Sequence, residues 1–190
     1  MKSFKRAVLV AALGFAFSGA SFAAENTMSR DDLRAAKDRI DADYKAAKDR
    51  CDAMSGNAKD VCEKEAKGNE KIAKAELDAR NENSDKARRK ALETKAEAQY
   101  EIAKEKCDDL QANAKDVCVK DAKAVEQRAK ADIKAGISGA TGASVSTDDR
   151  RDARDDAKDA QYSASKERCD SMSGDAKDRC VADVKARYGK

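Results

Sequence analysis

Six cysteines are the residues of this 190-residue chain whose type and spacing most clearly suggest chemistry. They occur in three pairs with one common interval: Cys51 and Cys62, Cys107 and Cys118, Cys169 and Cys180. Each pair belongs to a stretch that occurs three times and that places a tyrosine at a fixed distance before the first cysteine: Tyr44, Tyr100 and Tyr162. Such pairs can form disulfides, ligate a metal or act as a redox couple.

The interval favours disulfides that close helical hairpins. On one continuous helix the two sulfurs would lie roughly 16 Å apart, whereas a disulfide needs Cα atoms within about 7 Å. Gly56 and Gly174 stand midway between their cysteines, where a helix can end in a left-handed residue that glycine adopts cheaply. Asn57, Asn113 and Asp175 follow as expected N-caps of a returning helix, each with an acid three residues on.

We therefore predict an all-α fold of three disulfide-stapled antiparallel helical hairpins in an elongated, coiled-coil-like bundle. The predicted pairs are local, Cys51–Cys62, Cys107–Cys118 and Cys169–Cys180. In the middle copy Ala112 replaces the glycine, at a cost of about 1 kcal/mol if it is left-handed; a different turn with Asn113 in that role is the alternative. Zinc usually takes four Cys or His ligands, and this chain has no His, so two hairpins would have to pool their thiols.

The elements that position the cysteines must be helices with a thin core. The chain has no Pro and is 41% charged, and Ala, Lys, Arg and Glu are strong helix formers. Opposite charges at three- and four-residue spacings stabilise a helix by about 0.2–0.5 kcal/mol per pair. Large apolar residues are scarce, so the buried stripe must be mainly alanine. Each staple should contribute about 3 kcal/mol in the chain-entropy model, so we expect the disulfides to decide whether the chain folds.

The N-terminus has the features of a Sec-type signal peptide. Lys2, Lys5 and Arg6 precede an apolar run, and Ser21-Phe22-Ala23 offers small residues at a cleavage site. Residues 1–23 are too short in apolar sequence to be a retained anchor, and we expect no transmembrane segment after cleavage. Export and paired cysteines together predict a periplasmic protein in an oxidising compartment.

The charge of the mature chain argues against nucleic acid and membrane binding. Lys and Arg number 40 and Asp and Glu 37, and the leader removes three bases and no acids, which leaves 37 of each. Nucleic-acid binding wants a basic surface, often with aromatic residues, and all four Phe leave with the leader. Helices that lie on membranes need bulky apolar groups opposite a basic face. An alanine stripe supplies little insertion energy.

We divide the chain into four parts. Residues 1–23 are the signal peptide, 24–135 form two hairpins, 136–146 are a Gly/Ser-rich linker, and 147–190 form a third hairpin, which we expect to be separate. Two stripes are expected to face each other in the first hairpin: Leu33, Ile40, Tyr44, Ala47, Cys51 and Met54 opposite Val61, Cys62, Ala66, Ile72, Ala73 and Leu77. Residues 81–85 read as a break, with one long helix through them as the alternative.

No residue pattern indicates catalysis. General acid–base and nucleophilic catalysis need a base beside a reactive group in a water-excluding pocket; here the serines fall at turns and caps, and the acids lie on solvated helix faces. Redox motifs place two cysteines on one helical turn. We expect no enzymatic activity and no catalytic, cofactor-binding or metal-ligating residues. The recurring tyrosines are interpreted as a cover over the thin core, or alternatively as a row of contacts to a partner.

The run Tyr100-Glu-Ile-Ala-Lys-Glu-Lys-Cys107-Asp-Asp, continued by Asn113-Ala-Lys-Asp-Val-Cys118, resembles a set of small exported proteins of Gram-negative bacteria. Those proteins are largely uncharacterised and often carry the label "cell envelope biogenesis protein TolA", and the resemblance covers most of the mature chain. TolA itself is similar in the composition of its helical region, but its membrane anchor and folded C-terminal domain have no counterpart here. The resemblance implies an envelope role and brings no functional residues.

Three hypotheses for function follow. The leading one is a non-enzymatic periplasmic helical repeat protein with a structural or partner-binding role, its partner an envelope protein. The alternative is a protective hydrophilin of the late-embryogenesis-abundant type, suggested by very polar helices such as the one containing Ala103-Lys-Glu-Lys106. The third is metal storage through free thiols. The sequence leaves open whether the chain forms homo-oligomers.

Overall fold

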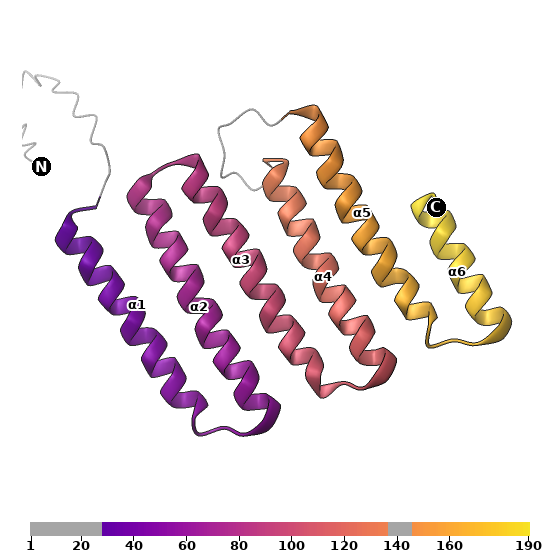
Figure 1. Cartoon of the computed structure of the whole chain (residues 1–190), viewed down its shortest axis with the longest axis horizontal. Helices are drawn as coiled ribbons and strands as arrows, with labels where there is room; N and C mark the ends of the chain where they lie inside the picture. The colour runs from indigo at the N-terminus through magenta and orange to yellow at the C-terminus, as the bar shows by residue number, and fades with distance from the viewer. Residues whose placement is uncertain (1–27, 137–145) are drawn as a thin grey trace, which may run out of the picture.

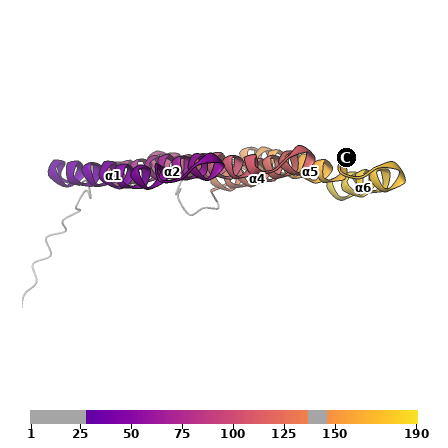
Figure 2. The same ribbon diagram turned by 90° about the horizontal axis from the view of Figure 1, so that it is seen from below.

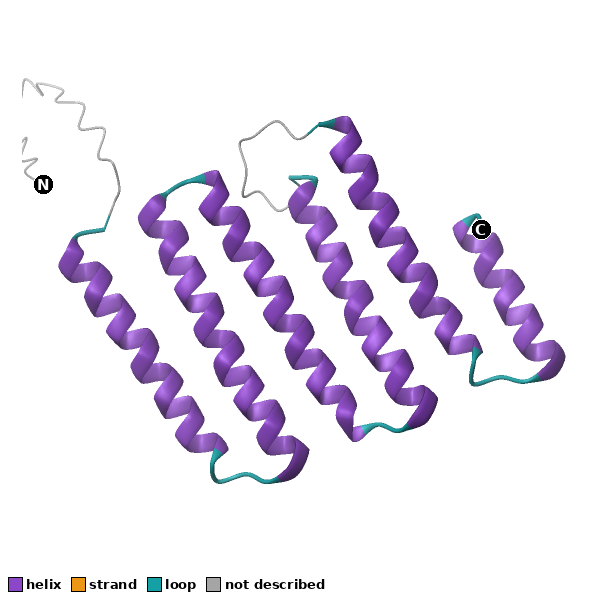
Figure 3. Ribbon diagram, viewed as in Figure 1, coloured by secondary structure: helices purple, strands orange, loops and turns teal. Residues whose placement is uncertain are grey.

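The computed structural model describes residues 28–136 and 146–190, and in these two ranges all regular structure is helical. The predicted signal peptide and most of the predicted linker, residues 137–145, lie outside them. The helices are α1 (Arg30–Cys51), α2 (Gly56–Glu82), α3 (Asp85–Lys106), the single turn η1 (Cys107–Asp109), α4 (Ala112–Lys134), α5 (Thr147–Cys169) and α6 (Gly174–Tyr188). Disulfides Cys51–Cys62, Cys107–Cys118 and Cys169–Cys180 join them in consecutive pairs. The predicted fold class is confirmed (Figure 3).

The helices stand side by side in one layer. Figure 1 shows each helix antiparallel to the one before it, and Figure 2 shows that the row is a single helix thick. Packing follows chain order, from α1 against α2 through to α5 against α6. No described helix covers either broad face of the layer, and α1 and α6 form its two edges.

The third hairpin continues this row, whereas we expected it to be separate. Helix α5 packs along α4 as closely as α2 packs along α3. Arg168 on α5 forms an ion pair of 2.6 Å with Asp121 on α4. The Gly/Ser-rich composition that marks the linker says nothing about the helix faces on either side of it, and those faces are what join the hairpins.

The chain breaks between α2 and α3, which removes the alternative of one long helix. Helix α2 ends at Glu82, and Asn83 adopts a left-handed conformation with φ 47°. The backbone N–H of Ala87 then donates to the Ser84 hydroxyl at 3.1 Å, which caps α3. Asparagine tolerates this backbone better than most residues, so Asn83 does here what glycine does elsewhere.

The first helices of two hairpins have side-chain caps, whereas the caps predicted for the returning helices are wrong. The backbone N–H groups of Asp32 and Asp149 donate to the hydroxyls of Ser29 and Ser146. The returning helices begin at Gly56, Ala112 and Gly174, so the residue in the capping position is Ser55, Gln111 or Ser173, none of which makes a side-chain capping bond. The expected caps Asn57, Asn113 and Asp175 lie inside the first turn, because the left-handed residue is the first residue of the returning helix.

The core consists of two narrow stripes on opposite sides of each inner helix. On α2, Cys62 and Leu77 lie toward α1, while Ala75 and Ala79 pack against Ala87 and Ala91 of α3. Gly68 permits a close approach of α2 and α3, since a methyl group built on it would lie 2.9 Å from Ile102 Cδ1. As predicted, the buried residues are mostly alanines.

Met54 does not belong to the α1 stripe. Helix α1 ends at Cys51, which places Met54 in the bend, where 46% of its surface is exposed. Leu110 and Met172 occupy the same place in the other two bends and are 41% and 45% exposed. We placed Met54 in the stripe because we extended the helical periodicity past Cys51, where the helix ends.

Candidate functional site

The neck of each hairpin, meaning the disulfide and the bend beside it, is built in the same way three times. The Cα–Cα distances across the disulfides are 5.5, 5.7 and 5.7 Å, and the first cysteine of each pair is fully buried. All six cysteines are bonded. Metal storage through free thiols, like any other thiolate chemistry, would first require reduction of a disulfide.

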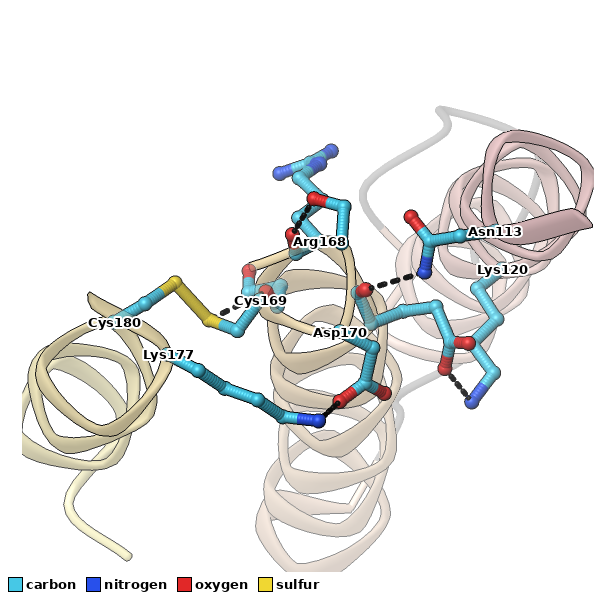
Figure 4. Close-up of polar contacts among 10 residues, drawn as sticks. Asn113, Lys120, Arg168, Cys169, Asp170, Lys177 and Cys180 are labelled. Atoms are coloured by element: carbon cyan, nitrogen blue, oxygen red, sulfur yellow. Dashed lines mark hydrogen bonds and ion pairs between the residues drawn. A yellow bond between two sulfur atoms is a disulfide. The ribbon is translucent and has the colours of Figure 1, made fainter. Parts of the chain in front are cut away.

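An ion pair closes each bend. Asp52 pairs with Lys59 at 3.2 Å, and two pairs of 2.9 Å occupy the same positions in the other hairpins, Asp108–Lys115 and Asp170–Lys177. The Lys177 ammonium holds the pKa of Asp170 below its ordinary value. Figure 4 shows this pair beside the Cys169–Cys180 disulfide. These contacts are exposed, so they orient the bend and add little to stability.

A seam, meaning the contact between neighbouring hairpins, occurs twice with the same polar groups. Between α2 and α3, Lys64 pairs with Glu105 at 3.5 Å, and Lys106 pairs with Glu65 at 2.7 Å. Between α4 and α5 the matching pairs are Lys120–Glu167 and Asp121–Arg168. The hairpins are thus held in one register by acid–base pairs that cross the seam in both directions.

The two seams differ at their asparagines. The Asn113 side-chain amide donates to the backbone carbonyl of Glu167 at 3.2 Å, a bond drawn in Figure 4. The matching amide nitrogen of Asn57 is buried without a hydrogen-bond partner. The α4–α5 seam therefore gains a hydrogen bond that the α2–α3 seam lacks.

An open groove of about 780 Å³ crosses α1 to α4. Tyr44 and Tyr100 line it, and the Lys123 ammonium lies 4.8 Å from the centre of the Tyr100 ring. The other lining residues alternate in charge or are small: Lys48, Asp60, Glu63, Lys64, Ala66, Lys67, Gly68, Lys71, Thr94, Glu97, Ala98, Glu101, Glu105 and Glu126. Such a surface offers aromatic contact and charges of both signs to a partner, without an enclosed chamber for chemistry.

Glu126 is the most buried charged group in the described part of the chain, with 4% of its surface exposed. Lys123 donates to it at 2.7 Å, and Lys130 forms a second pair of 2.9 Å. Burial favours the neutral carboxyl, but the two ammonium groups together outweigh it, so the pKa of Glu126 lies below its ordinary value. Lys130 also pairs with Glu97 on α3, which ties the two helices of the second hairpin together. Sequence reasoning missed this cluster, because its residues look like any other charges of an alternating helix.

The recurring tyrosines are all half-buried, which agrees with their interpretation as a cover over a thin core. Tyr162 packs edge-on against Tyr188, with ring centres 5.9 Å apart. The Tyr188 hydroxyl shares a hydrogen bond of 3.1 Å with the Ser165 hydroxyl. Tyr188 thus anchors the end of α6, a helix in which no residue is buried.

Comparison with known proteins adds no relative: no protein-family model, curated protein or solved structure matches the chain. No helix in residues 28–136 or 146–190 combines the length and the hydropathy needed to cross a bilayer. Three disulfides in a chain of this size are typical of proteins in oxidising compartments outside the cytoplasm.

Proposed function

We propose that the chain is a non-enzymatic helical repeat protein of the bacterial periplasm, with a structural or partner-binding role in the cell envelope. The observation that carries the proposal is the single-layer arrangement, which leaves two broad helical faces open. Stacked helical repeats characteristically bind partners along such extended surfaces. The N-terminal leader pattern, the disulfides and the resemblance to exported proteins labelled TolA support the location.

The partner-binding face is the groove that Tyr44 and Tyr100 line. Tyrosine supplies a large contact area at a low entropic cost, and the lining residues of both signs can form ion pairs with a partner. A groove that spans four helices suits an elongated helical segment of an envelope protein better than a small molecule.

Site-specific photo-crosslinking in periplasm tests this role. A photo-reactive amino acid replaces Glu101, an exposed residue of the groove, and in a matched variant it replaces Val125, which is 67% exposed and lies outside the groove. We expect a discrete cross-linked protein from position 101 and none from position 125. Equal capture from both positions, or none from position 101, contradicts the groove as a docking face.

Circular dichroism separates the proposal from a protectant role. A hydrophilin is largely disordered in dilute buffer and gains helix on drying, whereas a stapled array is helical in buffer and melts cooperatively. We expect high helicity in the oxidised protein and a large loss of helix on reduction, because the alanine seams bury little area. A disordered oxidised chain would favour the protectant.

A further inference from the structure

The outer edge of α1 carries the same small residues that are buried in the seams. On α3 the seam buries Ala91 and Ala98, and on α5 it buries Ala153 and Ala164. The residues of α1 at matching positions of the recurring stretch are Ala35, Ala42 and Ala46, and all three are exposed. Among the helices of residues 28–136 and 146–190, each of the other two first helices, α3 and α5, has a returning helix against this stripe, and α1 has none.

The acid and the base that form ion pairs across the seams also have counterparts on α1. Asp49 and Arg50 match Glu105 and Lys106, the residues of α3 that pair across the first seam, and both are exposed on α1. The edge of α1 therefore has an acid and a base in the order that a returning helix recognises elsewhere in the layer.

The free face of α6 offers a complementary set. Ala186 matches Gly68, which is buried in the first seam, and Asp183 matches Asp121, which pairs with Arg168 in the second; both are exposed on α6. Ala182 stands where the seams have a lysine, but Arg179, one turn earlier on the same face, restores a base. Arg179 is exposed and replaces a valine of the other two copies.

We propose that α6 of one copy docks on α1 of a second copy, head to tail, and continues the helical layer from chain to chain. Asp183 pairs with Arg50 of the second copy as Asp121 pairs with Arg168 within the chain. Arg179 pairs with Asp49, and Ala186 packs between Ala42 and Ala46. The proposal is independent of the role of the groove, because it uses the edges of the layer and leaves the broad faces free.

The two seams within the chain favour α6 as the helix that docks on α1, and not the α1 of another copy in a two-fold dimer. Both seams join a returning helix to a first helix, and α6 is the one returning helix in the described ranges without a seam. It has 15 residues against 27 in α2, yet it includes the half near the neck, where the seam ion pairs lie. A head-to-tail contact does not close on itself, so it produces open chains of copies.

Single cysteines at the two edges test the geometry. A methyl group built on Gly68 lies 3.6 Å from the Ala98 Cβ, and Ala186 and Ala42 match these two positions. That distance falls in the range of about 3.5–4.5 Å between the Cβ atoms of a disulfide. We therefore mix oxidised full-length A42C with oxidised A186C, add a mild thiol oxidant, and identify the cross-linked peptides by mass spectrometry.

We expect the mixed 42–186 dimer to form at least several-fold faster than either homodimer and faster than dimers with V125C, a control cysteine at an exposed position of the inner helix α4. A dominant 42–42 dimer would show a two-fold α1 edge and overturn the proposal. If the mixed dimers form no faster than those of V125C, α6 ends the layer and binds no second copy, which also overturns the proposal.

A charge swap tests the same contact without introducing a cysteine. In sedimentation experiments over rising protein concentration, we expect the wild type to form chains, R50E to weaken association several-fold, and R50E combined with D183R to restore it. Both residues are exposed, so circular dichroism should show the same helicity in all three proteins. If R50E associates as strongly as the wild type, or if the double variant associates no more strongly than R50E, the Asp183–Arg50 contact is rejected.

Discussion

Replacing Ala112 by glycine should stabilise the protein. The residue that starts each returning helix is left-handed in all three hairpins, with φ of 60° at Gly56, 56° at Gly174 and 48° at Ala112. Two of the three positions have glycine, which adopts this backbone without strain. The bend at Ala112 is therefore the one of the three in which a side chain strains the left-handed backbone.

The size of the effect follows from two opposing contributions. A left-handed backbone costs an alanine about 1–2 kcal/mol, while glycine increases the entropy of the unfolded chain and so costs about 0.4–1 kcal/mol. The net gain for A112G is about 0.5–1 kcal/mol. The reverse change, G56A, should cost a similar amount, and it is a clean test because a methyl group at Gly56 meets nothing within 4 Å.

The assay is thermal and urea unfolding of the oxidised proteins, in which about 1 kcal/mol corresponds to roughly 2–4 °C for a chain of this length. A matched control is A114G, the same substitution at an exposed position of the same helix. It should destabilise by up to about 0.5–1 kcal/mol, because glycine weakens a regular helix. If A112G lowers the midpoint as A114G does, or if G56A leaves it unchanged, the backbone at these bends does not control stability as argued.

Three further results are expected. Replacing Cys169 and Cys180 by serine should release α6, which buries no residue, and the loss should show as fast amide exchange confined to that helix; protection equal to the wild type would deny the staple its role. N113A should cost about 1 kcal/mol in urea unfolding, because it removes the amide bond across the second seam, whereas N57A should cost less, since the Asn57 amide has no partner; equal losses would contradict this. Because its folded pKa is lowered, ionised Glu126 contributes stability that is fully present above the ordinary value of 4.5 and lost as the pH falls through the lower folded pKa. E126Q should therefore be less stable than the wild type at neutral pH and lose less on acidification; parallel pH profiles would count against the cluster.

The hairpins could be predicted because covalent geometry limits the choices. A helix between Cys51 and Cys62 would hold the sulfurs too far apart to bond, and the glycine between them marks the place where the chain can turn. The same reasoning located the strained Ala112, because it compared matching positions of three copies. Each of these inferences rests on local sequence, where one residue type has a sharp conformational preference.

The layer and the charge clusters could not be predicted in this way. Alanine is common on every face of these helices, so the periodicity of α2 does not reveal that it has two buried stripes and not one. Lys123 and Glu126 look like solvated charges in the sequence, yet one covers a tyrosine ring and the other is buried. The N-cap expected at Asn113 failed for a related reason: the sequence shows a polar side chain but not the neighbouring helix to which it donates.

The presence of two narrow stripes on each inner helix explains why the molecule is a layer. A helix with one wide apolar face buries it in a bundle, but the stripes on α2 that face α1 and α3 are narrow and lie on opposite sides. Helices of this kind can add only at the edges of a row, and each addition leaves one more stripe uncovered. The stripe on α1 is therefore a consequence of how this chain builds every other contact, and α6, with Arg179 in place of valine, is the edge whose chemistry has changed most. Whether that change closes the row or selects the next copy is what the cysteine pair at positions 42 and 186 decides.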